Sequence, residues 1–176
     1  ALKRISYLLS DKTLIMLYYA HVQCHLNYMN FIWAPITQNL MQSIEITQRK
    51  ALRVILKKSW HCSRSELYSV KILPVSALCN VSTCLQIFKI SKQLLKNNIQ
   101  IHTASQFHQH TTRHRENFVA RKYNTVLGSH TFYIRGPNLF NTVPQDIKKF
   151  NSISIFKNRI REHFFEIYAI LSTIEE

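Results

Sequence analysis

Apolar residues recur at intervals of three and four along most of this chain, which is the spacing of α-helices that pack on one side. The longest stretch that is both periodic and basic is 37–58, whose apolar stripe has four members: Leu40, Ile44, Ala51 and Ile55. Five cations crowd into its second half: Arg49, Lys50, Arg53, Lys57 and Lys58. Thr37 can cap its first turn, and Pro35 marks the break before it. We predict a central helix here, with one packed face and one cationic face.

The same period predicts helices elsewhere in the chain. These helices are expected over 11–33 with Ser10 and Asp11 as cap candidates and a kink near 25–27, over 64–70 behind a capping box at Ser63, over 75–96, and from 152 onward. Alternation of the kind that strands need is almost absent: only 131–134 predicts a short strand or extended piece, with a turn at Gly136-Pro137 after it. The sequence therefore predicts a mainly α fold, an irregular helical bundle with one long basic loop and at most a short strand pair.

Periodicity disappears between about 99 and 130, where His, Thr, Gln and Arg dominate. An irregular stretch of about 30 residues inside a compact domain normally indicates function or disorder. Aromatic residues Phe118 and Tyr123 interleave there with four cations: Arg113, Arg115, Arg121 and Lys122. Guanidinium groups and aromatic rings suit the backbone and bases of single-stranded nucleic acid. The alternative is a surface loop whose charge only faces water.

Overall charge favours a polyanionic partner. The 176 residues include 23 Lys and Arg against nine Asp and Glu, for a formal net charge of +14, and 46% are hydrophobic, enough for one real core. No apolar run approaches the ~18 residues that span a bilayer, so we expect RNA or DNA rather than a membrane. For the basic half of 37–58, the alternative interpretation is a solvated helix end.

Metal sites and disulfides are not indicated by the His and Cys spacing. His21 and His25 stand one helical turn apart, but no third ligand is visible, and we prefer half-buried histidines. Three further histidines fit no closed zinc site: His108, His110 and His114. Four cysteines lack the two-residue spacing of zinc ribbons and are interpreted as reduced core residues: Cys24, Cys62, Cys79 and Cys84. We expect no metal or cofactor in this chain.

Six successive blocks resemble the C-terminal end of reverse transcriptases from jockey-like non-LTR retrotransposons. These blocks are Leu17-Tyr18 followed by LNYMNFIWAP, TQRKALRVI, HCSRSELY with ILPV behind it, HTTRH, IRGPNLFNTVPQDIK and SISIFKNRI. Two positions depart from the family: Phe140 stands where a Trp is usual, and Ala34 stands where a Gly often follows the Trp. The chain also opens at ALKRISYLLS, with neither Met nor a secretory signal, as a fragment of a larger protein would.

The resemblance implies both an architecture and partners. It implies a thumb-like helical domain over 1–98, a basic irregular segment over 99–136 and a C-terminal helical segment over 137–176 that packs back. In that family the region is expected to hold template RNA and target DNA during target-primed reverse transcription. The upstream polymerase palm would be its protein partner and would hold the Mg²⁺, and a functional element would act inside the cell, in the nucleus.

Catalytic residues are not predicted in this chain. Two-metal chemistry needs clustered carboxylates, whereas the chain has only two aspartates, Asp11 and Asp146, and its one Glu pair is terminal. Two isolated glycines cannot form a phosphate-cradling loop, and no nucleophile-base arrangement stands out from chance. Two hypotheses remain: a non-catalytic nucleic-acid-binding part of a reverse transcriptase, or a degenerate or repurposed helical remnant that acts as a protein-interaction module. They differ in whether basic residues of separate helices converge on one surface.

Overall fold

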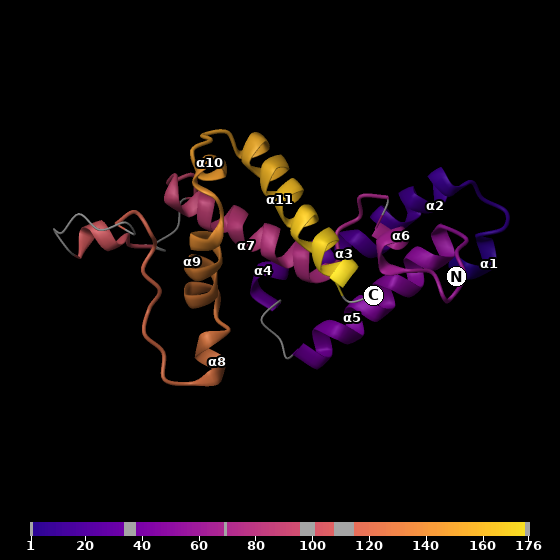
Figure 1. Cartoon of the computed structure of the whole chain (residues 1–176), viewed down its shortest axis with the longest axis horizontal. Helices are drawn as coiled ribbons and strands as arrows, with labels where there is room; N and C mark the ends of the chain where they lie inside the picture. Colours follow the sequence, from indigo (N-terminus) through magenta and orange to yellow (C-terminus); the bar gives the residue numbers. More distant parts are fainter. Residues whose placement is uncertain (1, 34–37, 69, 96–100, 108–114, 175–176) are drawn as a thin grey trace.

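The computed structural model describes residues 2–33, 38–68, 70–95, 101–107 and 115–174. Over these residues the chain is mainly α-helical, as the sequence pattern predicts (Figure 1). The strand-like pairing that they contain is one antiparallel bridge, between Thr103 and Phe118. The fold class predicted from the sequence is therefore confirmed.

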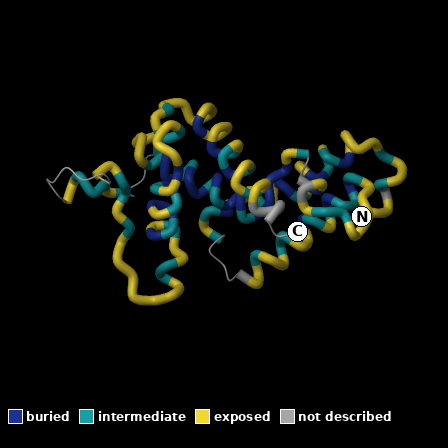
Figure 2. The backbone as a smooth tube through the Cα atoms, viewed as in Figure 1, coloured by how far each residue is buried: buried dark blue, intermediate teal, exposed yellow. Residues whose placement is uncertain are grey.

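The helix at the centre of the molecule is α7 (Val75–Ser91), not the segment 37–58 that the charge pattern singled out. Helices α4 (Asn30–Trp33), α5 (Gln38–Ile55), α9 (Phe132–Thr142) and α11 (Ile153–Ile174) all pack against it. Buried residues are concentrated along α7 and the faces turned toward it (Figure 2). Its apolar residues lie on all sides, which is why its pattern is less one-sided than that of a surface helix.

The larger core lies where α7, α9 and α11 meet, and it is aromatic. The rings of Phe88 and Phe156 stack with centroids 4.1 Å apart, and Phe140 lies 6.1 Å from Phe156. Gly136 faces α7 at close range, since a Cβ added there would lie 2.8 Å from Ile87 Cδ1. The absence of a side chain at this position lets the two helices approach.

The strand and turn predicted around Gly136 are therefore wrong. Residues 131–134 enter α9 as its cap and first turn, and Gly136 and Pro137 are buried within that helix. Short alternating patterns resemble strands, but the contact with α7 makes helix the better solution here. The helix also continues through Pro137 to Thr142.

A smaller core joins the first part of the chain. It consists of six fully or almost fully buried residues: Leu14, Tyr18, Leu52, Ile55, Leu67 and Ile72. Helix α2 (Asp11–Tyr18) supplies the first two, α5 the next two, and α6 (Arg64–Tyr68) one more. Local signals start α2 and α6 as the sequence predicts, because the Ser10 hydroxyl accepts from Thr13 N–H and the Ser63 hydroxyl from Glu66 N–H.

Helix α2 continues through a π-helical turn, η1 (Tyr19–Gln23), into α3 (Cys24–Asn27). The chain then bends at Tyr28, whose ψ is 116°, and at Met29, whose φ is 45°, before α4 begins. The predicted kink is thus real and lies one residue beyond the predicted position. It turns α4 onto α7.

Gln48 connects the two cores. Its side-chain amide donates to the Tyr18 hydroxyl and to the Leu73 carbonyl, both at 2.9 Å, and its carbonyl accepts from Val75 N–H at 3.1 Å. The Glu45 carboxylate accepts from Ser76 N–H at 3.2 Å. Helix α5 therefore caps the N-terminus of α7, where Pro74 has no side-chain donor or acceptor to do so.

The packed face of α5 is rotated from the predicted stripe. Leu40 is 56% exposed, whereas Gln48 and Leu52 are buried. Helix α5 also ends at Ile55 rather than at Lys58, in a turn where Lys57 has φ 51° and Lys58 N–H bonds to the Arg53 carbonyl at 3.0 Å. This is the Schellman arrangement, with Lys at the position that usually carries Gly.

Helix α7 ends in the same way, with Gln93 at φ 54°, so it stops at Ser91 and not at Lys96 as predicted. The predicted cap, Thr37, and the predicted break at Pro35 lie outside the described residues. The remaining short elements are α1 (Leu2–Ile5), η2 (Ala104–Gln106), α8 (Val126–Ser129) and α10 (Gln145–Lys148).

Candidate nucleic-acid interface

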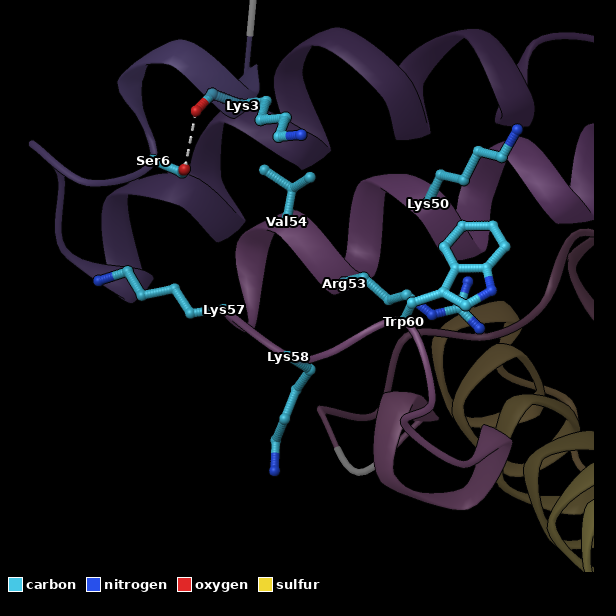
Figure 3. A pocket seen from close by; sticks show the side chains of 8 residues that line it. All are labelled: Lys3, Ser6, Lys50, Arg53, Val54, Lys57, Lys58 and Trp60. Atoms are coloured by element: carbon cyan, nitrogen blue, oxygen red, sulfur yellow. Dashed lines mark hydrogen bonds between the residues drawn. The ribbon is translucent and has the colours of Figure 1, made fainter.

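Five cations from three parts of the chain line one groove of about 520 Å³ at the end of α5 (Figure 3). Helix α1 contacts α5 and contributes one cation, α5 contributes two, and the turn after α5 contributes two more. The cations are Lys3, Lys50, Arg53, Lys57 and Lys58. The other residues that line the groove are Ser6, Val54 and Trp60. The Schellman turn sets the direction of Lys57 and Lys58 and sends the chain back past Arg53 to Trp60.

An Arg–Trp pair forms part of the groove wall. The guanidinium carbon of Arg53 lies 4.9 Å from the centroid of the Trp60 ring, at cation–π distance. Arg53 is half-buried, and its Nε is buried with no hydrogen-bond partner among the described residues. Trp60 itself is 65% exposed. A large aromatic surface therefore faces solvent beside several positive charges.

Two of the groove cations are paired with carboxylates. Lys57 lies 3.1 Å from Asp11, and Lys58 lies 3.1 Å from Glu66. The pKa of Glu66 is held below its ordinary value by hydrogen bonds from the Cys62 thiol and from Lys58, and the pKa of Lys58 is raised by Glu66 in turn. These pairs are exposed, so solvent screens them and a competing phosphate can displace the carboxylate.

The other three groove cations differ from Lys57 and Lys58 in their pairing. Over the residues that the structure describes, no carboxylate is paired with Lys3, Lys50 or Arg53. Cations in a concave surface with apolar walls attract phosphates more strongly than the same cations on a convex one. Lys3, Lys50 and Arg53 are therefore the best placed to contact phosphates, whereas Lys57 and Lys58 must first leave their carboxylate partners.

Four of the five cations predicted on 37–58 thus come together, and one does not. Arg49 is half-buried on α5 and does not line the groove. Two residues that line the groove were missed by sequence reasoning: Lys3 and Trp60. Trp60 carried a signal, since it stands two positions after the basic run ends at Lys58. Nothing in the sequence placed Lys3 beside residues almost fifty positions later.

The second predicted basic region lies at the opposite end of the molecule (Figure 1). Arg115, Arg121 and Lys122 are exposed there, and Arg113 lies outside the described residues. Arg121 lies over the ring of Tyr133 at 5.5 Å. These cations do not converge with those of the groove, so the two predicted regions are separate surfaces.

This second region is anchored to α9. The side-chain amide of Asn141 accepts from Phe118 N–H at 3.0 Å and donates to the Phe118 carbonyl at 2.9 Å. The Phe118 ring packs against Phe140 at 5.4 Å. The stretch that follows Phe118 therefore starts from a fixed point on the larger core.

The burial of the histidines and cysteines differs from two expectations. His21 and His25 are exposed, not half-buried, and Cys24 is exposed rather than a core residue, because all three lie on the outer side of the helix that α2 begins. Burial raises the pKa of both Cys79 and Cys84 to about 12, as expected for core thiols, whereas Cys62 is only half-buried. In the part of the chain that the structure describes, no group of His, Cys, Asp or Glu could hold a metal ion. The trio His108, His110 and His114 lies outside that part.

The two aspartates serve ion pairs. Asp11 is the partner of Lys57, and Asp146 of α10 lies 3.2 Å from Lys149, the residue after that helix. None of the described helices is long and apolar enough to span a bilayer.

No known protein family, curated protein or solved structure matches this chain.

Proposed function

We propose that this chain binds nucleic acid through the groove at the end of α5. The observation that supports it is the convergence of Lys3, Lys50 and Arg53, from separate helices, on one concave surface. A net charge of +14 supplies the long-range attraction. Phosphates are the natural partners of such a surface, and contacts with phosphates carry little sequence information.

The resemblance to jockey-like reverse transcriptases supports a more specific role. In that role the chain is the non-catalytic C-terminal part of a retrotransposon-encoded RNA-directed DNA polymerase, and it holds template RNA or target DNA for an upstream palm. The palm would supply the carboxylates and the Mg²⁺. This chain would contribute only affinity for the RNA or DNA and its orientation toward the palm.

The test compares two double variants of equal charge change. Lys3→Ala/Lys50→Ala removes two groove cations, and Arg121→Ala/Lys122→Ala removes two from the opposite end. Fluorescence anisotropy of a short single strand at several salt concentrations gives the slope of log affinity against log salt. At about 0.7 per phosphate contact, the first variant should flatten the slope by roughly 1.4, and the second should leave it unchanged.

The control is circular dichroism, which should be the same for both variants because Ala is at least as good a helix former as Lys or Arg. If both variants flatten the slope equally, binding follows net charge alone. A slope that neither variant changes would reject the groove as the binding surface.

A second candidate function has its own observation. An almost wholly apolar hollow of about 500 Å³ lies between α5 and the first helices, lined by Val22, Leu26, Leu40 and Ile44 among others. Leu40 in its wall is 56% exposed. An exposed apolar hollow is typical of a protein contact, so the repurposed protein-interaction module is the alternative if nucleic acid does not bind.

A further inference from the structure

We infer that Trp60, supported from one side by Arg53, is a stacking platform for an unpaired base, so the groove selects single strands over duplexes. This inference rests on the proposed function and specifies its substrate class. It assigns to Trp60 a role distinct from that of the groove cations. The cations recognise the backbone, and the indole recognises an accessible base face.

The geometry leaves one face of the indole for a ligand. Arg53 occupies the other face, with its guanidinium carbon 4.9 Å from the ring centroid. Since 65% of Trp60 is nevertheless exposed, the exposed area belongs to the opposite face and the ring edges. Figure 3 shows the indole lying across the Arg53 guanidinium, with the Lys50 side chain extending beside it.

The cations around this face suit a nucleobase, because a base carries phosphates with it. A base that stacks on the indole has phosphates on both sides of its nucleotide, and Lys50 and Lys58 line the same groove as Trp60. Stacking on an aromatic platform combined with a basic groove is how proteins hold single strands with little sequence preference. Bases inside a duplex are already stacked on each other and cannot use the platform.

The other tryptophan, Trp33, differs from Trp60 in its burial and in its contacts. Trp33 is half-buried, its indole N–H donates to the Tyr28 carbonyl at 2.7 Å, and it packs beside Val75 and Cys79 at the start of α7. Trp33 is not among the residues that line the groove. Fluorescence that nucleic acid quenches should therefore come from Trp60, and Trp60→Phe should abolish the quenching.

The experiment uses Trp60→Ala and Trp60→Phe with three probes of the same length: oligothymidylate, an abasic strand with the same phosphates, and a duplex. Trp60→Ala should weaken oligothymidylate binding by about 5- to 150-fold, the range that one base–aromatic stack supplies, and Trp60→Phe by less. Binding of the abasic strand and of the duplex should not change. In the unsubstituted chain, oligothymidylate should quench the fluorescence and the abasic strand should not.

The outcomes separate this inference from the proposed function. If the unsubstituted chain binds the abasic strand and oligothymidylate equally, the phosphate groove stands and the stacking platform is rejected. If Trp60→Ala weakens all three probes alike, Trp60 only positions Arg53, and the platform is again rejected. Binding to none of the probes, with a blue-shifted Trp60 on phosphatidylserine vesicles, would reject both and indicate a membrane surface.

Discussion

The two ends of the molecule use different packing and present charge differently. The end that holds the groove has a small core of six buried residues and is joined to α7 by the polar side chain of Gln48. The other end has a larger aromatic core in which α7, α9 and α11 meet, with Gly136 at the closest approach. Both ends are basic, and over the described residues five cations of the first end line one groove.

This difference shows that a run of basic residues becomes a candidate site only where packing brings separate segments together. At the groove, α1 lies against α5, and a turn with Lys57 in the left-handed conformation sets the direction of Lys57 and Lys58. At the other end, Arg121 lies over Tyr133, and neighbouring cations face solvent separately. Similar composition thus gives a concave basic surface in one place and a dispersed one in the other.

The largest effect is expected for Gln48→Leu, which removes the hydrogen bonds that join the two ends. It leaves the Val75 N–H, the Leu73 carbonyl and the Tyr18 hydroxyl without their partner in a buried place. The free energy of unfolding, measured by urea titration, should fall by about 2–3 kcal/mol, since each orphaned buried group costs about 1–3 kcal/mol and relaxation recovers part.

The matched control is Gln42→Leu on the exposed face of the same helix, which should change stability by less than about 0.5 kcal/mol. Equal effects of the two substitutions would mean that the Gln48 hydrogen bonds do not hold the ends together.

A smaller effect is expected for Gly136→Ala at the aromatic end. Ala gains about 1 kcal/mol of helix propensity over Gly, but its Cβ would lie 2.8 Å from Cδ1 of Ile87, which is fully buried and has little room to move. We expect a net loss of about 1 kcal/mol in the free energy of unfolding. Binding in the groove should stay the same.

The double variant Gly136→Ala/Ile87→Val sharpens this prediction, because Val lacks the Cδ1 atom in question. The double variant should be more stable than the sum of the two single effects predicts. Simple additivity would show that the contact with Ile87 is not what requires glycine at this position.

The smallest effect is expected for Glu66→Gln, which releases the groove residue Lys58 from its ion pair. The salt slope for single-strand binding should steepen by at most roughly 0.7, the value of one added phosphate contact. Glu162→Gln, which breaks the 3.2 Å pair with Arg159 on α11, is the control and should leave the slope unchanged.

The pH dependence of this effect has a definite sign. Because the pKa of Glu66 is lowered in the folded chain, the pair with Lys58 persists at and above the ordinary value of 4.5 and is lost as pH falls through the lowered value. The difference between the two proteins should therefore be present at neutral pH and vanish in acid. A difference that persists in acid would assign it to something other than the charge of Glu66.

Features that depend on neighbours within one helical turn followed from the sequence. The Ser10 and Ser63 caps are examples, because each joins residues three positions apart. The helical character of the chain and the clustering of Lys50, Arg53, Lys57 and Lys58 belong to the same class. The physical reason is that helical periodicity, capping and local charge density are all properties of short segments.

Only the tertiary structure decided the features that depend on distant contacts. Gly136 lies within a helix because the absence of a side chain lets α9 approach Ile87 of α7 closely. Gln48 is buried because it caps a helix that begins 27 positions later. Lys3 joins the groove because α1 lies on α5. Burial, close approach and convergence of charge arise where segments far apart in the sequence meet. The pattern within one segment does not predict which distant segment packs against it.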